Sequence, residues 1–500
     1  MLNKIKKTKI IATLGPSVTG KIFTEKEYKD PKNKKEIENA KLTLKSIYEA
    51  GVNAVRFNFS HGTYEEQLIK LRLAREVAEE MNLNIGFILD TKGPEIRVHK
   101  MTKGQAEIKK DSEVTIHTTK KVEGTSKEFS VYDSSGTYNM ANDVKEGDTI
   151  FVDDGKLKLI ATKVDVNKGI IVTTAKNTHA IKDNKRINLP NANYSIPFMS
   201  EKDANDIKFA IENNFDFIAA SFVNSASNVN EVRKLLDENG GSHIKIISKI
   251  ETMNAINLID EIIDASDSIM VARGDLGLEI PYYDVPYYEK YIIKACRHKG
   301  KTVIVATQML DSLETKMQAT RAEVTDVFFA VERGADSTML SGETANGLYP
   351  VNAVEVMATI DKSSENLFDY ERAYKVYFKH TPFIKTKAGK IATKVAKYVT
   401  PTREIANGVF EYGAIIYIGN DKNTIEALSN IRPAAPIYVY TNEQSFKRSF
   451  SINYGVFVNY VENYNEILMN HTSLIGEIKK GLPEESNKVI VVINNKIIRQ

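Results

Sequence analysis

Three charged residues in the middle of the chain, Lys249, Glu251 and Asp275, have the types and the spacing needed to bind a cation beside an anion. Two carboxylates with room between them suit a hard divalent cation such as Mg²⁺, which usually takes only one or two protein carboxylates. A lysine beside that cation favours a strongly anionic ligand, and phosphate is the obvious candidate. An internal Lys–Glu ion pair at the end of a strand explains the same residues, and this stretch alone leaves both interpretations open.

The stretch from Ile244 to Ile280 must place these charges. Its two short apolar runs, IKIISKIE and SIMVARGD, flank a helical pattern at Asn254–Ala265. This order predicts one βαβ unit of a parallel sheet. Because a strand has a period of two, Lys249 and Glu251 should point to the same side. The C-terminal ends of such strands are where barrels and open α/β sheets do their chemistry.

Composition limits the class of protein. The 500 residues, 42% hydrophobic and 27% charged, predict about three domains with ample core. A net charge of +3 is too small to indicate nucleic-acid binding. The single cysteine, Cys296, excludes an intrachain disulfide, fits a reducing compartment and lies in a helical pattern typical of core packing. With no signal-peptide pattern and no run near the roughly 20 apolar residues of a membrane span, we expect a soluble, cytoplasmic protein.

Strand and helix patterns alternate along most of the chain. Besides the two central strands, strands are expected at Thr8–Gly15, Val52–Phe59, Ile85–Leu89, Asp216–Phe222, Lys301–Met309 and Ala335–Leu340. Eight such units predict a (β/α)₈ TIM barrel, an α/β fold, built from residues 1–97 and 195–355.

Two further regions interrupt or follow this rhythm. Residues 98–194 contain short Val/Thr/Ile runs separated by glycines, which predicts an inserted all-β barrel on two linkers and hence a candidate lid. Residues 356–500 predict a C-terminal α/β domain, with a helix from Val351 to about Lys375, a second helix at Lys385–Val399 and four short apolar runs.

Polar residues gather where the second and third strands end. Arg56, Asn58 and Ser60 share one parity, so they should line one face of a strand end. On a barrel strand that is covered on both sides, such a polar face is unusual. The third strand runs into a charged segment, Asp90–Arg97, whose Gly-Pro pair indicates a shaped loop at a strand end.

The chain resembles the pyruvate kinase family over nearly its whole length. The strings KIIATLGPS, RFNFSHG, LDTKGPEIR, VDDG, NLP, SEKD, SKIET, VARGDLGLEI, ATQML, TRAEVTDV and LSGETANGLYP occur in that family's order. The resemblance implies the last step of glycolysis, transfer of a phosphoryl group from phosphoenolpyruvate to ADP to give pyruvate and ATP. It also implies a homotetramer, with the C-terminal domain serving effectors and assembly.

The resemblance implies roles for the residues at the strand ends. Glu251 and Asp275 resemble the ligands of Mg²⁺ or Mn²⁺, and Lys249 resembles the group that stabilises the phosphoryl group in flight. Arg56 is similar to a phosphate contact of the family. The remaining substrate contacts implied are the amides of Gly274 and Asp275, for the substrate carboxylate, and Thr307, which shares proton supply with water.

The resemblance also implies a K⁺ site and a nucleotide site. The K⁺ donors would be Asn58, Ser60, Asp90 and the carbonyl of Thr91, with Glu95 typical of K⁺-dependent members. The nucleotide contacts would be Asn58, His61, Arg97 and Lys185. Arg186 follows Lys185 where the family usually has glycine. Ordinary structural roles remain open: an Arg56–Asp90 ion pair, a helix cap at Thr307 and a turn at His61.

The chain departs from the family pattern in four segments. Residues Lys21–Lys35 form a longer insertion, expected to be a solvated loop or short helix. Asn191–Met199 lacks the family's usual acidic residue, and Lys316–Ala319 replaces a proline-containing loop at the subunit contact. At Gly419–Thr424, where members activated by fructose 1,6-bisphosphate have a Ser/Thr/Gly-rich loop, Asp421 would repel phosphate. We therefore expect no strong activation by this sugar bisphosphate.

Two other functions compete with this one. A Mg²⁺-dependent phosphoenolpyruvate mutase or aldol-type lyase would also place two carboxylates on a metal, but it needs neither ADP nor a K⁺ site and lacks a β insertion after the third strand. A catalytically silent barrel that binds a regulatory partner or RNA should have a broken site, whereas Lys249, Glu251, Asp275, Arg56 and Thr307 are all present.

Overall fold

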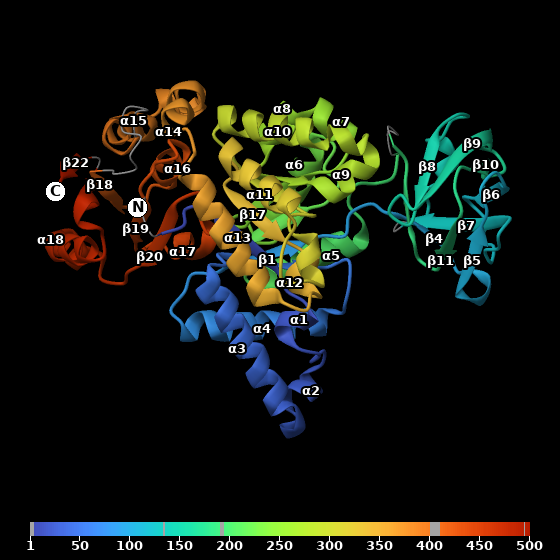
Figure 1. Cartoon of the computed structure of the whole chain (residues 1–500), viewed down its shortest axis with the longest axis horizontal. Coiled ribbons are helices and arrows are strands. Elements are labelled where there is room, and N and C mark those ends of the chain that lie inside the picture. The colour runs from blue at the N-terminus through green and yellow to red at the C-terminus, as the bar shows by residue number, and fades with distance from the viewer. Residues whose placement is uncertain (1–4, 134–135, 191–194, 401–410, 495) are drawn as a thin grey trace.

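A closed barrel of parallel strands forms the centre of the molecule (Figure 1). The computed structural model describes residues 5–133, 136–190, 195–400, 411–494 and 496–500, and within these ranges the barrel has eight strands. In chain order they are β1 (Lys9–Thr13), β2 (Ala54–Asn58), β3 (Gly86–Asp90), β13 (Phe217–Ala220), β14 (Lys245–Ile250), β15 (Ser268–Ala272), β16 (Thr302–Ala306) and β17 (Ser337–Leu340). The predicted TIM barrel is therefore confirmed, with strand ends that shift by a few residues.

Helices surround this barrel. They are α1 (Pro16–Thr19), α2 (Glu25–Lys29), α3 (Lys34–Ala50), α4 (Tyr64–Glu80), α5 (Glu201–Glu212), α6 (Ala226–Glu238), α7 (Met253–Asn257), α8 (Ile259–Ala265), α9 (Arg273–Glu279), α10 (Val285–Lys299), α11 (Arg321–Arg333), α12 (Gly342–Ala345) and α13 (Pro350–Glu365). The insertion at 21–35 contains the short helix α2. Two predictions of helix length were wrong: the helix expected at 254–265 is divided at Leu258, and the one expected to reach Lys375 ends at Glu365.

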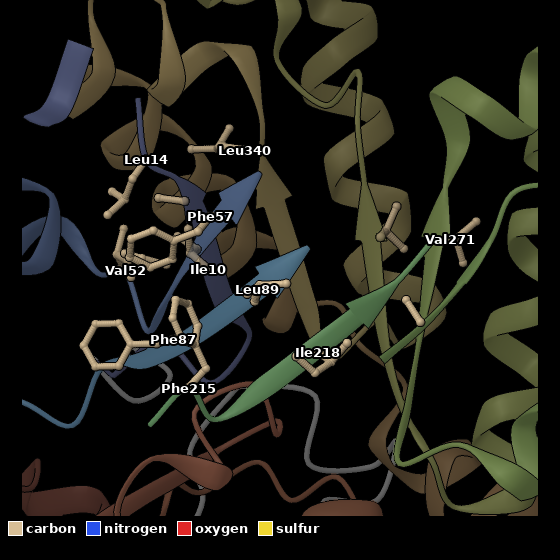
Figure 2. Packing of buried hydrophobic residues seen from close by; sticks show 14 of the residues in the cluster. Ile10, Leu14, Val52, Phe57, Phe87, Leu89, Phe215, Ile218, Val271 and Leu340 are labelled. Carbon is tan, nitrogen blue, oxygen red and sulfur yellow. The ribbon is translucent and has the colours of Figure 1, made fainter. Parts of the chain in front are cut away.

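Alternation along the strands separates two cores. Ile10 and Phe57 point outward and pack under the helices (Figure 2), and Val55 belongs to the same buried cluster. Ile247 points into the barrel, together with Ile11 and Ile88. On each strand, the side chains two or four residues C-terminal to these inward residues point inward as well. They therefore lie at the C-terminal mouth of the barrel, where they can contact one another.

The inserted region forms a second closed barrel, as predicted, at one end of the molecule (Figure 1). Its strands are β4 (Ile96–Val98), β6 (Glu113–His117), β7 (Glu128–Asp133), β8 (Thr149–Val152), β9 (Leu157–Asp165), β10 (Ile170–Ala175) and β12 (Arg186–Asn188), beside a pair made of β5 (Gln105–Ile108) and β11 (His179–Lys182). It has an apolar core of its own. The boundary expected at residue 98 falls within β4, and the boundary expected at 194 lies outside the described residues.

The C-terminal region forms a sheet in the order β20-β19-β18-β21-β22. Its strands are β18 (Tyr412–Ile418), β19 (Ile437–Thr441), β20 (Val456–Tyr460), β21 (Lys488–Ile493) and the antiparallel β22 (Lys496–Arg499), which the sequence did not predict. Its helices are α14 (Tyr370–Arg372), α15 (Lys387–Val399), α16 (Lys422–Asn430), α17 (Phe446–Ser449) and α18 (Tyr464–Lys480). The boundary expected at 355/356 falls within α13.

This region closes the N-terminal end of the barrel. Ile452 joins the core inside the barrel, and its carbonyl accepts a hydrogen bond from Ser337 Oγ at 2.8 Å. Arg448 donates to both carboxylate oxygens of Asp216 at 2.9 Å, and Arg432 pairs with Asp336 at 3.2 Å. The inserted barrel contacts the opposite, C-terminal end, where Asn188 donates to Glu279 at 3.1 Å.

Candidate active site

A polar cavity of about 340 Å³ lies at the C-terminal mouth of the barrel. It brings together most of the predicted site residues, namely Arg56, Asn58, Ser60, His61, Asp90, Arg97, Lys185, Lys249, Glu251 and Asp275. Thr91, Gly274 and Thr307, also predicted, do not line it. Strand alternation explains why these residues lie together. Ile247 on β14 points into the barrel, so Lys249 and Glu251, two and four residues later, point to the same side.

Lys249 stands at the centre of the charged network. Its Nζ lies 3.1 Å from Asp90 Oδ1 and 3.1 Å from Glu251 Oε1, and it donates to Ser221 Oγ at 2.8 Å. Burial alone would lower the pKa of Lys249, but the two carboxylates outweigh it and raise the pKa above its usual value. The side chain is therefore a fixed ammonium group. The ion pair considered as an alternative for this stretch is present, and it lies inside the cavity.

Glu251 and Asp275 lie in contrasting environments. Glu251 is fully buried; it accepts a hydrogen bond from the Phe222 amide at 2.6 Å, and its Oε1 faces the Lys249 ammonium group at 3.1 Å. Burial raises the pKa of Glu251 to about 7 despite the charge of Lys249. Burial would also raise the pKa of Asp275, but the Arg186 guanidinium and Lys249 lower it to about 2.

This donor set fits a hard divalent cation. Both carboxylates face one cavity, and Glu251 Oε1 is a buried oxygen whose contact in the described part of the chain is the Lys249 ammonium group, a cation that a bound metal could complement. Among the described residues, no group of three or more His, Cys, Asp or Glu side chains is placed to hold a metal. The protein thus offers two carboxylates and leaves the other positions to substrate and water, as Mg²⁺ sites commonly do.

Arg56 and Asp90 form a second charged pair at the mouth. Arg56 Nε lies 2.5 Å from Asp90 Oδ2, and Arg56 Nη1 donates to Thr13 Oγ1 at 3.1 Å. Burial would raise the pKa of Asp90, but Arg56 and Lys249 hold it below its usual value. Arg56 is therefore fixed in the cavity, where its remaining donors are available to an anion.

Ser221 is a site residue that sequence reasoning missed. Its hydroxyl lies 3.2 Å from Asp90 Oδ1 and 2.7 Å from the carbonyl of Thr91, and it accepts from Lys249. Ser221 follows the inward residues Phe217 and Ala219 at the same parity. The strand alternation that predicted the inward direction of Lys249 therefore also predicts that of Ser221.

Arg186 is a second missed residue, and it comes from the other barrel. Its guanidinium pairs with Asp275, lies 3.8 Å from Glu95 and stacks over the Phe222 ring at 4.7 Å. Burial would lower the pKa of Arg186, but Asp275 and Glu95 raise it. Nearby, Asn188 donates to Glu279 at 3.1 Å. These contacts hold the inserted barrel against the mouth.

Thr307 adopts an unusual backbone conformation just after β16. Its φ of +67° is an outlier for a β-branched residue. Its Oγ1 accepts a hydrogen bond from the Gly274 amide at 2.7 Å. This contact is the helix cap that was considered as an alternative role for Thr307. The Gly274 amide, predicted to bind the substrate carboxylate, therefore donates to Thr307 in this structure. Arg273 fixes the turn by donating to the carbonyls of Thr307 at 2.9 Å and Gln308 at 3.0 Å.

Two of the predicted nucleotide contacts, Lys185 and Arg97, form ion pairs within the protein. Lys185 lies 2.7 Å from Asp153, and Arg97 pairs with Glu95 at 2.7 Å, while His61 is exposed at the rim. Of the predicted K⁺ donors, Asn58 Oδ1 accepts from the Ser60 amide at 3.0 Å, and the Thr91 carbonyl points to Ser221.

Fold and site together define a (β/α)₈-barrel enzyme with a basic, anion-binding mouth. A family model described as "Pyruvate kinase, barrel domain" matches residues 5–354. The chain is 49% identical to a pyruvate kinase of Mycoplasma pneumoniae over 91% of this chain and 90% of that one. It is 46% identical to a pyruvate kinase of Mycoplasma genitalium over 96% and 97%. The chain therefore belongs to the pyruvate kinase family.

A solved structure gives the same result. A pyruvate kinase from Cryptosporidium parvum superposes with a TM-score of 0.86 at 32% identity, covering 99% of this chain and 96% of that one. The protein is thus a phosphotransferase with pyruvate kinase activity, in which phosphoenolpyruvate and ADP are the substrates and pyruvate is a product. Enzymes of this family generally depend on a metal. No helix in the described ranges is long and apolar enough to cross a bilayer.

Proposed function

We propose that phosphoryl transfer takes place in the cavity around Lys249. The observation that carries this proposal is the convergence of Lys249, Glu251 and Asp275 on one space at the barrel mouth. The phosphorus–oxygen bond of phosphoenolpyruvate breaks as a bond to the ADP β-phosphate oxygen forms. Lys249 and Arg56 carry fixed positive charge toward the three equatorial oxygens over which charge is spread in the transition state.

Glu251 and Asp275 would hold Mg²⁺ or Mn²⁺ in this reaction. When bound, the divalent cation would supply positive charge that polarises the substrate oxygens. Asp275 must then give up Arg186, and Glu251 must be ionised. The enolate left after transfer takes a proton at carbon, through water held near Thr307, to give pyruvate. Thr307 and the Gly274 amide can both serve the substrate once their mutual hydrogen bond opens.

We also propose K⁺ as an activator and a nucleotide position beside it. Asn58, Ser60, Asp90 and the carbonyl of Thr91 would supply the oxygen donors for K⁺, as the strand ends bring Asn58 and Asp90 into register. Asn58, His61, Arg97 and Lys185 would contact the nucleotide phosphates. Arg97 and Lys185 would exchange their carboxylate partners for phosphate when ADP binds.

An assay of pyruvate formation tests these assignments. With phosphoenolpyruvate and ADP, Mg²⁺ should be essential and K⁺ should stimulate. Omitting ADP should abolish product formation, whereas a mutase or a lyase would not need ADP. Activity that is undiminished after removal of all divalent cation with a chelator would contradict the proposed roles of Glu251 and Asp275.

Removing Arg186 should change the affinity of the site for metal. In Arg186→Gly, the guanidinium no longer competes for Asp275, so Mn²⁺ should bind the substrate-free enzyme about tenfold more tightly, since a charged hydrogen bond is worth about 1.5–3 kcal/mol. Electron paramagnetic resonance of free Mn²⁺ measures this directly. Arg186→Lys, which keeps the charge, serves as the matched control and should lie closer to wild type. Equal Mn²⁺ affinity in all three proteins would contradict the prediction.

Fructose 1,6-bisphosphate should not activate this enzyme strongly. Asp421 is the N-cap of α16, and its carboxylate accepts from the Asn423 amide at 3.1 Å and from Thr424 Oγ1 at 2.6 Å. An acidic side chain thus takes the helix N-terminus that would otherwise favour a phosphate. The measurement is the half-saturating concentration of phosphoenolpyruvate with and without the sugar bisphosphate. A several-fold fall on its addition would refute the prediction.

Three wider features complete the proposal. The chain would divide into a catalytic barrel, an inserted lid and a C-terminal effector domain, and it would assemble as a homotetramer. Exposed Tyr282 and Tyr287, at and just before the start of α10, and Met317, in the loop before α11, support a subunit contact on this side of the barrel. A cytoplasmic location would agree with a glycolytic role and with an unoxidised, buried Cys296.

A further inference from the structure

Arg186 has no role in the proposed mechanism once a divalent cation is bound. It lies on β12 of the inserted region and lines the catalytic cavity together with Glu251 and Asp275. Its Nη1 donates a hydrogen bond to Asp275 Oδ1, which is an oxygen of a proposed metal ligand. This ion pair must open when Asp275 holds the cation. A guanidinium group is then left inside the cavity without its closest carboxylate partner.

The surrounding structure keeps Arg186 at the mouth after this pair opens. Its guanidinium carbon lies 4.7 Å from the centre of the Phe222 ring, and its Nε lies 3.8 Å from Glu95 Oε1. Two residues later on β12, Asn188 donates to Glu279 of α9, and both of these side chains are buried. The strand therefore stays docked against the catalytic barrel, and the guanidinium stays in the cavity.

Both terminal nitrogens of Arg186 then have hydrogens to donate. Nη2 is buried and has no hydrogen-bond partner in the described part of the chain, and Nη1 loses Asp275. The other carboxylate nearby, Glu95, is already engaged, because its Oε2 accepts from Arg97 at 2.7 and 2.9 Å and its Oε1 faces Nε of Arg186. Buried donors without an acceptor cost free energy. A guanidinium with two free terminal nitrogens matches the paired oxygens of a phosphate.

Charge in the cavity favours the same partner. Within the described residues, the cavity is lined by the carboxylates of Asp90, Glu95, Asp154, Glu251 and Asp275. Phosphoenolpyruvate and ADP bring further negative charge, and repulsion between anions is strong where little water is present. Burial would lower the pKa of Arg186, but Asp275 and Glu95 raise it, so the guanidinium remains charged. A cation that is released from Asp275 when the site is loaded therefore stabilises the bound anions.

We propose that Arg186 is a further catalytic residue, whose guanidinium turns from Asp275 to the phosphoryl group in transfer once the divalent cation is bound. This role rests on the function proposed above for the cavity. Arg186 forms no covalent bond and gives up no proton. Its Nη1 and Nη2 donate hydrogen bonds to oxygens of the phosphoryl group while the bond to phosphoenolpyruvate breaks and the bond to ADP forms. Its fixed charge thereby stabilises the transition state.

Arg186→Gly tests this role at saturating Mg²⁺, phosphoenolpyruvate and ADP, where a change in metal affinity no longer affects the rate. The value of kcat should fall by at least about tenfold, as loss of one charged hydrogen bond implies. Arg186→Lys keeps the charge without the paired donors, so its kcat should lie between the two. Lys182→Gly is the matched control, because it removes an exposed cation from β11, another strand of the inserted region. It should keep kcat within about twofold of wild type.

Free guanidinium ion gives a second readout, part of which needs no turnover. Arg186→Gly leaves a space beside Phe222 where the ion fits, so guanidinium chloride at a concentration far below denaturing should restore kcat severalfold. In the substrate-free variant, the same ion should compete for Asp275 and weaken the binding of Mn²⁺, measured by electron paramagnetic resonance. Wild type should show neither effect, because its own side chain occupies the position. Sodium chloride at equal ionic strength is the control for screening.

The opposite outcomes are equally definite. An Arg186→Gly enzyme with wild-type kcat would make Arg186 a competitor of the metal and nothing more, and the proposal would be overturned. A lowered kcat that guanidinium leaves unchanged, in a variant that still melts like wild type, would assign Arg186 a structural role and overturn it as well. Failure of the proposed function looks different: wild type itself would then make pyruvate without a divalent cation or without ADP, and the basis of this inference would be lost too.

Discussion

Replacing Lys249 with methionine is expected to lower kcat by at least about 10²–10³-fold, the usual cost of removing one preorganised group that stabilises a transition state. Lys249 is held as an ammonium group by Asp90 and Glu251, so its charge needs no rearrangement when the phosphoryl group moves. Because Lys249 is placed to stabilise the phosphoryl group while it moves more than it stabilises the bound substrate, kcat should fall more than the half-saturating phosphoenolpyruvate concentration rises.

The same strand supplies a matched control. Lys245 begins β14 with the same inward parity, but at the opposite end of the barrel, where it lies 3.9 Å from Glu426 and over the Phe450 ring. Lys245→Met should keep kcat within about twofold of wild type. A circular dichroism melt confirms folding of both variants. A Lys249→Met enzyme that retains more than a tenth of wild-type kcat would contradict the proposed role.

Replacing Glu251 with glutamine should weaken binding of the divalent cation. The amide preserves shape and can still accept from the Phe222 amide, but it removes one of the two negative charges that face the cation. Loss of a ligand should cost at least as much as loss of a supporting residue, which is about 10–100-fold in affinity. Titration of Mn²⁺ followed by electron paramagnetic resonance gives the affinity, and the Mg²⁺ dependence of kcat should shift in parallel.

Glu261→Gln serves as the control for this substitution. Glu261 lies on α8, in the same barrel unit, and accepts from the Ala226 amide at 3.1 Å on the surface. It should leave Mn²⁺ affinity unchanged. Mn²⁺ binding of wild-type strength in Glu251→Gln would show that Glu251 is not a ligand, and the buried Lys249–Glu251 pair would then have a structural role only.

Periodicity explains why much of the site could be predicted from the sequence. Lys249 and Glu251 are two residues apart on a strand that alternates, and Arg56 and Asn58 have the same relation on β2. Parity and chain direction are local properties, so they place each side chain inward and at one end of the barrel. Closure of the strands then brings the groups together.

The remaining contacts depend on geometry that no local pattern contains. Arg186 reaches Asp275 only because the inserted barrel folds back onto the mouth, and the sequence marks Arg186 as no more than an unexpected residue. The Thr307 hydroxyl meets the Gly274 amide because the backbone at Thr307 has a positive φ, which threonine rarely adopts. Arg273, at the start of α9, holds the carbonyls of this turn from another part of the chain.

The one cysteine of the chain has a practical consequence. Cys296 is fully buried on α10, and burial raises the pKa of its thiol well above the usual value. A thiol reagent can react only when this helix separates transiently from the barrel, so the labelling rate of the unmodified enzyme counts such openings. The unmodified enzyme therefore contains its own probe of local opening at α10.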